Sequence, residues 1–302
     1  MIRERLGGLE AVEAALETAR EGEREALENR RQELLSTFET LTAEEKIILS
    51  RLPRRPKTVQ FIDALFTDFF AQRGDRQCRE DTSILGGIAL FHGRPVTVIG
   101  HRKGTTIEEN MACNFGMPGP EGYRKAQRLM KQAEKFGRPI ITFLDTPGAY
   151  PGMQAEERGQ GEAIASSLAL MSRLRVPVIC VITGEGNSGG ALALGLGDRV
   201  LMLENAYYSV VSPEACATIL WKDAKKRGEA GEALKLTAQD LERFGVIDGI
   251  IPEALGGAQR DPKALYAALD KALCACLDEL CMLSGDELIA ARYQKYRTIG
   301  LA

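Results

Sequence analysis

The chain has 302 residues, of which 44% are hydrophobic and 27% are charged, as is usual for a soluble globular protein with a sizeable core. Its formal net charge of -3 provides no global basic field, so no specific nucleic-acid partner is expected. No apolar run approaches the roughly 18 residues of a membrane span, and residues 1–6 lack the apolar core of a signal peptide. We therefore expect a cytoplasmic protein with no membrane contact.

Residues 1–50 are charged and helix-prone, and they predict an N-terminal helical extension. This extension either packs on a partner or on the protein body, or it stays exposed as an arm. Its short apolar stripe consists of Leu6, Leu9, Val12 and Leu16. The proline- and arginine-rich segment 51–57 breaks the helical pattern and indicates a linker, whose basic charge we expect to be solvated. The second predicted domain covers residues 51–302.

From residue 83 onward, apolar strand-like segments alternate with helical ones. The expected strands are 83–90, 95–101, 140–145, 178–183, 200–203 and 208–211. The expected helices lie near 121–136, 156–174 and 188–197, and further helices begin near 213 and 238. The first two strands form a predicted hairpin around residues 91–94. The alternation predicts an α/β fold whose largely parallel sheet is covered on both faces.

The seven cysteines are odd in number and scattered, which indicates reduced thiols. Cys274, Cys276 and Cys281 lie close enough in the sequence to suggest a metal site. Leucines recur at helical spacing from 265 to 280, however, so this segment is predicted to be an amphipathic helix. Neighbours at i and i+2 on a helix point to nearly opposite sides, so Cys274 and Cys276 could not share a tetrahedral zinc ion. We expect no metal on this chain.

Two glycine-rich turns, 145–152 and 184–190, each follow an apolar strand and each open a helix. Glycine lets backbone N–H groups point outward and lets a ligand approach closely. The start of a helix adds unpaired donors and a positive dipole end. This combination suits a phosphate, a carboxylate or an oxyanion that forms during a reaction.

The second turn matches the dinucleotide-binding fingerprint G-x-G-x-x-G over Gly184–Gly189, and Glu204 lies twenty residues beyond Gly184. Against this alternative, the expected helix is short and glycine-rich, and the motif lies two strands into the sheet. The first turn matches the D-x-x-G switch motif of GTPases, but the chain lacks the G-x-x-x-x-G-K-[ST] loop that a nucleotidase requires. A dehydrogenase therefore stays open as a distant alternative, and a GTPase is excluded.

Gly186–Gly190 also matches the G-x-S-x-G nucleophile elbow of hydrolases. In that fold the acid and the histidine follow the serine along the chain, whereas His92 and His101 both precede Ser188 here. A serine without a base is a poor nucleophile. We therefore expect Ser188 to cap its helix rather than to attack a substrate.

Six segments of the chain form a recognisable set: 100–104, 116–126, 145–152, 155–160, 184–194 and 251–258. Together they closely resemble the family of alpha subunits of bacterial acetyl-CoA carboxylase carboxyltransferase. The resemblance implies a crotonase-type spiral of repeated ββα units. It also implies transfer of a carboxyl group from carboxybiotin, on a separate carrier protein, to acetyl-CoA. The product would be malonyl-CoA, in the first committed step of fatty acid biosynthesis.

By the same resemblance, Gly189 and Gly190 supply the backbone donors for the biotin ureido oxygen. The matching hole for the thioester enolate, and a zinc ribbon, would belong to a beta subunit, with which the chain is expected to form an α2β2 heterotetramer. Biotin carboxylase and biotin carboxyl carrier protein are the other expected partners, and no cofactor is expected to be bound covalently by this chain. The absence of a Cys-x-x-Cys pair from the sequence agrees with an alpha subunit alone.

Further residues are expected to bind substrate. Around the two turns these are Gly148, Ala149, Gly186, Asn187 and Ser188. Basic residues could meet the phosphates of CoA, although single charges more often form a solvated face. The basic candidates are Arg124, Lys125, His101, Arg102 and Lys103.

The family usually has glycine where this chain has Asn187. We expect the turn to survive because asparagine tolerates a left-handed backbone better than most residues. Replacing Gly190 by valine is expected to leave the fold nearly intact but to lower carboxyl transfer. The alternative is a binding or assembly subunit that keeps the fold while the chemistry lies elsewhere, although retention of the segment 188–191 favours an enzyme.

Overall fold

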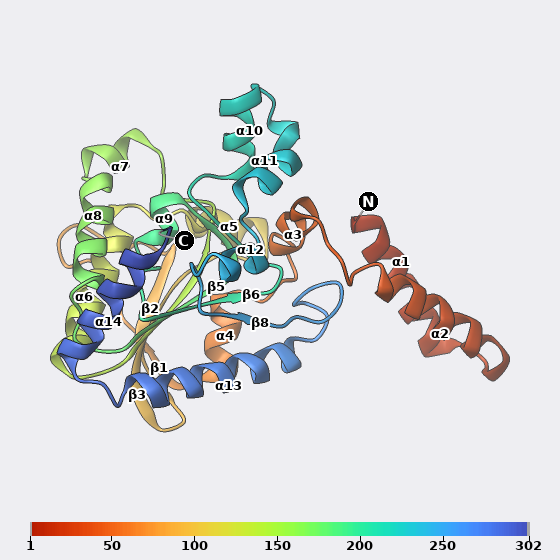
Figure 1. Ribbon diagram of the computed structural model, residues 1–302, viewed down its shortest axis with the longest axis horizontal. Helices are drawn as coiled ribbons and strands as arrows, with labels where there is room; N and C mark the ends of the chain where they lie inside the picture. The colour runs from red at the N-terminus through yellow and green to blue at the C-terminus, as the bar shows by residue number, and fades with distance from the viewer. Residues whose placement is uncertain (1, 301–302) are drawn as a thin grey trace.

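The computed structural model describes residues 2–300, and these form one mixed sheet of eight strands surrounded by helices (Figure 1). The strands are β1 (Thr67–Ala71), β2 (Ile84–Phe91), β3 (Arg94–His101), β4 (Ile140–Thr146), β5 (Val178–Asn187), β6 (Arg199–Leu203), β7 (Tyr207–Ser209) and β8 (Gly249–Ile251). They lie in the order β1-β2-β3-β4-β5-β6-β8, and β7 pairs with the end of β5. Strands β1 to β3 are antiparallel and the other pairs are parallel, so the largely parallel α/β sheet is confirmed.

Helices cover both faces of this sheet. They are α1 (Ile2–Thr18), α2 (Glu21–Ser36), α3 (Ala43–Ser50), α4 (Thr58–Leu65), α5 (Ile107–Ala112), α6 (Pro120–Lys135), α7 (Met153–Glu157), α8 (Gln160–Met171), α9 (Ser188–Leu192), α10 (Pro213–Trp221), α11 (Arg227–Leu234), α12 (Ala238–Arg243), α13 (Pro262–Leu280) and α14 (Gly285–Thr298). Ile99 and Gly100 of β3 point to opposite faces. Leu129 of α6 packs on the face of the sheet that carries the Ile99 side chain. Thr58 of α4 packs on the opposite face, at Gly100. No helix within residues 2–300 is long and apolar enough to cross a lipid bilayer.

The hairpin predicted around residues 91–94 is confirmed. Strands β2 and β3 pair along their whole length, and the two residues at the tip, His92 and Gly93, have φ values of 47° and 77°. Positive φ at both central positions characterises the type I′ turn, whose twist matches that of the flanking strands. The turn therefore holds His92 at the end of the sheet where β3 begins.

Strands β4 and β5 form the centre of the sheet, and all of their residues are buried. Continuous apolar runs are typical of parallel strands that are covered on both faces. Strand β5 continues to Asn187 instead of ending at 183, so residues 184–187 are strand and not turn. The helix expected over 188–197 is the five-residue α9. The helix expected over 156–174 is two helices, α7 and α8, separated by Gly159 with φ 82°.

At the N-terminus, α1 and α2 form a hairpin that projects from the body of the protein (Figure 1). Leu6 and Leu9 are buried there in a small apolar cluster with Phe38 and Leu49. Helix α3 falls within the predicted extension, yet it packs against β5, β7 and α11. The domain boundary at residue 50 stays a prediction.

The basic segment 51–57 is not a solvated linker, so that expectation is wrong. Arg55 is buried, and its Nη1 donates to Glu253 Oε2 at 3.0 Å. Arg51 donates through Nε to Glu185 Oε2 at 2.9 Å. Acidic residues from distant parts of the chain thus neutralise this segment, and they fix it against the carboxyl end of β5.

Candidate functional site

The two glycine-rich turns meet at the carboxyl ends of β4 and β5. A Cβ atom on Gly190 would overlap the backbone nitrogen of Ala149 and would lie 2.6 Å from the carbonyl carbon of Gly148. No side chain fits at such a distance, so only glycine allows the two backbones to touch here. The structure therefore brings Gly148, Ala149 and Gly190 together.

Ser188 carries the unusual backbone conformation of the second turn. Its φ of 56° lies in the left-handed region, which few residues other than glycine adopt. Asn187 is extended instead, with φ −114° and ψ 133°. The expectation that Asn187 takes a left-handed conformation is therefore wrong. The expected helix cap at Ser188 is also wrong, because Asn187 occupies the cap position of α9 and no side chain accepts a hydrogen bond there.

The backbone N–H groups of Gly189 and Gly190 are available to an acceptor. They belong to the first turn of α9, where N–H groups have no partner within the helix. Within residues 2–300, neither group donates to a backbone carbonyl. The hydroxyl of Tyr123 donates to the carbonyl oxygen of Gly190 at 3.1 Å and so holds this part of the turn in place. The turn presents two adjacent donors, the arrangement that an oxyanion requires.

A mainly apolar groove of about 360 Å³ opens beside Gly189, whereas Gly190 is buried and does not line it. Its lining residues are Ser188, Gly189, Leu192, Tyr208, Ser209, Val210, Leu234, Leu241 and Val246. A Cβ on Gly186 would lie 2.8 Å from the ring of Tyr208, so Gly186 is packed behind the groove rather than in it. A small ring with one polar edge can lie on the apolar walls while the edge meets the N–H group of Gly189.

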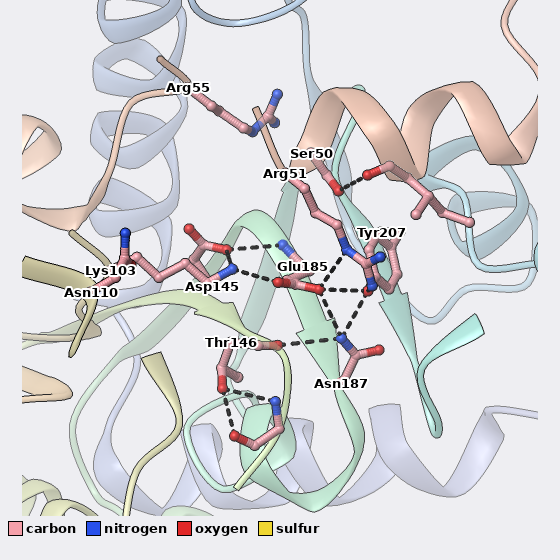
Figure 2. Close-up of polar contacts among 12 residues, drawn as sticks. Ser50, Arg51, Arg55, Lys103, Asn110, Asp145, Thr146, Glu185, Asn187 and Tyr207 are labelled. Carbon is pink, nitrogen blue, oxygen red and sulfur yellow. Dashed lines mark hydrogen bonds and ion pairs between the residues drawn. The ribbon is translucent and has the colours of Figure 1, made fainter. Parts of the chain in front are cut away.

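A buried ion network lies beside the second turn (Figure 2). Lys103, from the segment after β3, donates to Asp145 Oδ1 at 2.8 Å and to Glu185 Oε1 at 2.6 Å. The other carboxylate oxygen of Glu185 accepts from Arg51 Nε at 2.9 Å and from the Tyr207 hydroxyl at 2.8 Å. The network therefore ties the ends of β4 and β5 to the segments that follow β3 and α3.

Opposite charges keep both carboxylates of this network ionised although they are buried. Burial opposes ionisation of Asp145, but the ammonium groups of Lys103 and Lys57 outweigh it and lower the pKa to about 2. Burial also opposes ionisation of Glu185, and Lys103 and Arg51 together lower its pKa below the usual value. The carboxylates in turn raise the pKa of Lys103 against its own burial. The network is thus charged and compensated at neutral pH.

The side chain of Asn187 points into this network (Figure 2). Its Nδ2 donates to the hydroxyl oxygen of Tyr207 at 2.9 Å, and the residue is 1% exposed. Its Oδ1 is buried and has no hydrogen-bond partner within residues 2–300. Asn187 therefore supports the turn from behind, whereas Ser188 and Gly189 reach the surface of the groove.

Neither histidine is placed to act on Ser188. His101 is fully buried, and within the described chain its two ring nitrogens have no hydrogen-bond partner. Burial lowers the pKa of His101 to about 4, against the attraction of Asp145, so the ring is neutral at pH 7. His92 hydrogen-bonds to Asp270 at the other end of the sheet. The geometry therefore excludes the serine hydrolase alternative.

The basic candidates for CoA phosphates are largely engaged within the chain. Lys125 is 1% exposed and donates to the carbonyl oxygen of Asp81 at 2.8 Å. Arg124 donates through Nη1 to the carbonyl oxygen of Arg158 at 2.9 Å. His101 is buried, Lys103 is held by Asp145 and Glu185, and Arg102 is the exposed member of the set. The structure does not bring Arg124 and Lys125 to the groove beside Gly189.

The second turn also lacks the geometry that dinucleotide binding requires. It requires a glycine loop between strand and helix, but residues 184–187 belong to β5. A Cβ on Gly184 would lie 2.6 Å from the carboxyl carbon of Asp145, so this glycine serves packing. Glu204, which lies twenty residues beyond Gly184 at the acidic position of this fingerprint, accepts a hydrogen bond from the backbone of Glu253 at 3.0 Å. The glycines of the motif therefore form a packed strand end and not a pyrophosphate loop.

Fold and site define a class of protein: an α/β subunit with paired backbone donors at the carboxyl end of a parallel strand, beside an apolar groove. The solved structure of transcarboxylase 12S has this fold, with a TM-score of 0.58 at 20% identity over 74% of this chain and 41% of that chain. A Pseudomonas malonate decarboxylase hetero-tetramer in complex with coenzyme A matches with a TM-score of 0.57 at 18% identity, over 70% and 84% of the two chains. These likenesses confirm the predicted crotonase-type fold.

Sequence similarity identifies the family. The family model described as "Acetyl co-enzyme A carboxylase carboxyltransferase-like" matches residues 1–300. The acetyl-coenzyme A carboxylase carboxyl transferase subunit alpha of Bacillus velezensis is 55% identical over 263 residues, which are 87% of this chain and 81% of that protein. The subunit of the same name from Bacillus subtilis is 53% identical over 277 residues, 91% and 85% of the two chains. The chain therefore belongs to this family of carboxyltransferase alpha subunits, as its motifs predicted.

Proposed function

We propose that this chain holds the carboxybiotin side of the reaction of its family. In that reaction a carboxyl group passes from carboxybiotin to acetyl-CoA and gives malonyl-CoA for fatty acid synthesis. The observation that carries the assignment is the pair of N–H groups of Gly189 and Gly190, which have no backbone partner within residues 2–300 and of which the first lies at an apolar groove. The ureido oxygen of biotin would accept from these donors, while its thioether ring would lie on the apolar walls formed by Leu192 and Val210.

The chemistry explains why two donors matter. When CO2 leaves the biotin nitrogen, the bonding electrons remain on the ureido group and negative charge develops on its oxygen. Each preorganised donor aimed at such a charge is worth about 2.7–4 kcal/mol of barrier. The decarboxylated ureido nitrogen then takes a proton from the methyl group of acetyl-CoA, and the enolate attacks CO2. No protein base is required, in agreement with the full burial of His101.

The other half of the site would come from a partner. The described chain offers one such donor turn, and the enolate of the thioester requires a second set of donors, which we assign to a beta subunit. We further propose an α2β2 assembly in the cytoplasm, with a zinc ribbon on the beta chain and with biotin carboxyl carrier protein and biotin carboxylase as further partners. The mainly apolar groove beside Gly189 would then close when both chains and the carrier meet.

Reconstitution tests this proposal. The purified chain, supplied with biotin carboxylated in situ and acetyl-CoA, is expected to form no malonyl-CoA by itself. Activity is expected to appear when a purified beta subunit is added, together with an α2β2 mass in light scattering. Malonyl-CoA formed by this chain alone would overturn the divided site, and a monodisperse monomer in the presence of the beta chain would overturn the assembly.

A further inference from the structure

Three side chains of metal-binding type gather at the end of the sheet opposite to the glycine turns. His92 lies at the tip of the β2–β3 hairpin, and Asp270 and Cys274 lie on α13. One ligand atom from each of the three residues lies within 4.8 Å of the other two. Strands β3 and β4 are parallel, so the start of β3 is remote from the carboxyl end of β4 where the turns meet.

The fold fixes the backbone positions of these three residues. Asp270 and Cys274 are four residues apart and so lie on one face of α13, while Leu269 and Leu273 on the neighbouring face are fully buried and hold the helix against the core. The hairpin tip is a tight turn, and the His92 ring packs edge-on against Phe91 with ring centroids 4.7 Å apart. The three ligands therefore come from two rigid elements.

The separations of the ligand atoms lie on both sides of those in a zinc site. The Nε2 atom of His92 lies 2.8 Å from Asp270 Oδ1, and the Cys274 thiol is the third member of the cluster. Tetrahedral zinc bonds of about 2.0–2.3 Å place neighbouring ligand atoms roughly 3.5 Å apart. Small side-chain rotations would bring imidazole, carboxylate and thiolate to that separation. Imidazole nitrogen, carboxylate oxygen and thiolate sulfur are the ligand types that zinc uses in proteins.

We propose that His92, Asp270 and Cys274 form a zinc-binding site that clips the β2–β3 hairpin to α13. Three protein ligands leave the fourth position to water, and the site faces solvent because His92 is exposed. The spacing argument against a site shared by Cys274 and Cys276 is unaffected, since Cys276 is not a member of this cluster. The sequence could not indicate the site because His92 is 178 residues from Asp270 along the chain.

Cobalt titration of the full-length chain tests the proposal. The untagged protein is stripped with a chelator, kept reduced with a phosphine and titrated with Co2+, whose thiolate charge-transfer absorption reports a Cys ligand. We expect a band that saturates at one equivalent and is abolished by one equivalent of Zn2+. The Cys274→Ser variant should lose the band. The matched control is Cys281→Ser, which removes an exposed thiol of the same region that contacts Arg94, and it should keep the band.

A second measurement isolates the hairpin ligand. Zinc is expected to raise the unfolding temperature of the wild type, since a ligand that binds only the folded state stabilises it. The rise should be lost in His92→Gln and in Cys274→Ser. His92 is exposed, Cys274 is half-buried and its replacement by serine is nearly isosteric, so both variants should fold normally by circular dichroism. A chain without a saturating band, or a band that persists in Cys274→Ser, overturns the site. If zinc still raises the unfolding temperature of His92→Gln, then His92 is not a ligand and the proposed link between the hairpin and α13 is wrong.

Discussion

The two glycine-rich turns look alike in the sequence, but they use their glycines differently. In the first turn, Gly148 has φ 138° and a Cβ placed on it would meet no atom within 4 Å, so glycine is needed there for its backbone conformation. In the second turn, a Cβ on Gly184 would lie 2.6 Å from the carboxyl carbon of Asp145, and one on Gly190 would overlap Ala149. Glycine is needed there because main chain and side chains pack without room for a Cβ.

This difference shows which positions the site depends on most. A residue forced into an unfavourable backbone conformation costs about 1–3 kcal/mol, and neighbouring atoms can remain where they are. A side chain inserted between two packed backbones displaces both of them. The donors at Gly189 and Gly190 are held by the contact of the second turn with the first, so changes at that contact should exceed changes within either turn.

The largest effect on stability and turnover taken together is expected for Gly190→Val. Overpacking typically costs about 1–3 kcal/mol of stability, and the displaced N–H group should lower carboxyl transfer by roughly two to three orders of magnitude. The earlier expectation that the fold stays nearly intact is wrong, because a Cβ at this position would overlap the backbone nitrogen of Ala149. Urea unfolding of the chain and the initial rate of the assembled enzyme measure the two effects.

The matched control is Gly189→Ala. Its Cβ would lie 3.3 Å from the Cγ2 atom of Ile164, a side-chain contact that can relax, and its N–H group remains. This variant should unfold within about 1 kcal/mol of the wild type, the usual scale of a small change away from packed backbone. If Gly190→Val had the same free energy of unfolding and the same initial rate as Gly189→Ala, the contact between the turns would not be what holds the donors in place.

The next largest effect is expected for Lys103→Met, which removes the cation that joins the first turn to the second through Asp145 and Glu185. Removing one partner of a buried pair leaves uncompensated charge and costs about 3–5 kcal/mol of stability. Urea unfolding at pH 7 measures the loss. The control is Arg175→Ala, whose partner Asp286 is 81% exposed and whose ion pair should contribute less than about 1 kcal/mol. Equal losses in the two variants would contradict a buried network.

Much of this molecule follows from local sequence patterns. The strands around 140–145 and 178–183, the hairpin at 91–94 and the leucine helix after 265 were predicted, because hydrophobic periodicity and turn residues are local signals. The C-terminal ends of β5 and α9 were not predicted. Glycine-rich sequence suggests a loop, whereas β5 is extended through its glycines by pairing with β7, a contact that no local pattern reveals.

The ion network was missed for the same reason. Arg51 lies in a segment whose composition indicates a solvated linker, and its partner Glu185 is 134 residues further along the chain. One signal was present: Asp145 and Glu185 both lie where neighbouring parallel strands end, and polar side chains at such ends converge. Long-range pairing of charges could be inferred from topology, but not from composition.

A smaller effect is expected from the pH dependence of stability, through His101 beside the second turn. Burial lowers the folded-state pKa from 6.5 to about 4, so between these values the unfolded chain binds a proton that the folded chain does not. The stabilisation is fully present above pH 6.5 and is lost as the pH falls toward 4. Between pH 7 and pH 5 the loss should be about 2 kcal/mol.

Urea unfolding at several pH values measures this slope, and His101→Phe, which lacks the ring nitrogens, is the comparison. All other titratable groups are the same in the two proteins, so the difference between the two slopes isolates His101. The variant should lose stability less steeply between pH 7 and pH 5. Parallel slopes in the two proteins would show that folding does not lower the pKa of His101.

The smallest effect is expected for Asn187→Gly, which restores the residue usual in the family. The change removes the hydrogen bond to Tyr207 and adds backbone freedom to an extended residue, each worth about 1 kcal/mol or less. Loss of the buried Asn187 Oδ1, which has no partner within residues 2–300, offsets part of that cost. Net stability should therefore change by about 1 kcal/mol in urea unfolding.

Because the side chain points into the ion network and not into the groove, kcat and the KM for carboxybiotin should stay within about threefold of the wild type. A tenfold gain in kcat/KM would instead show that Asn187 obstructs the donors.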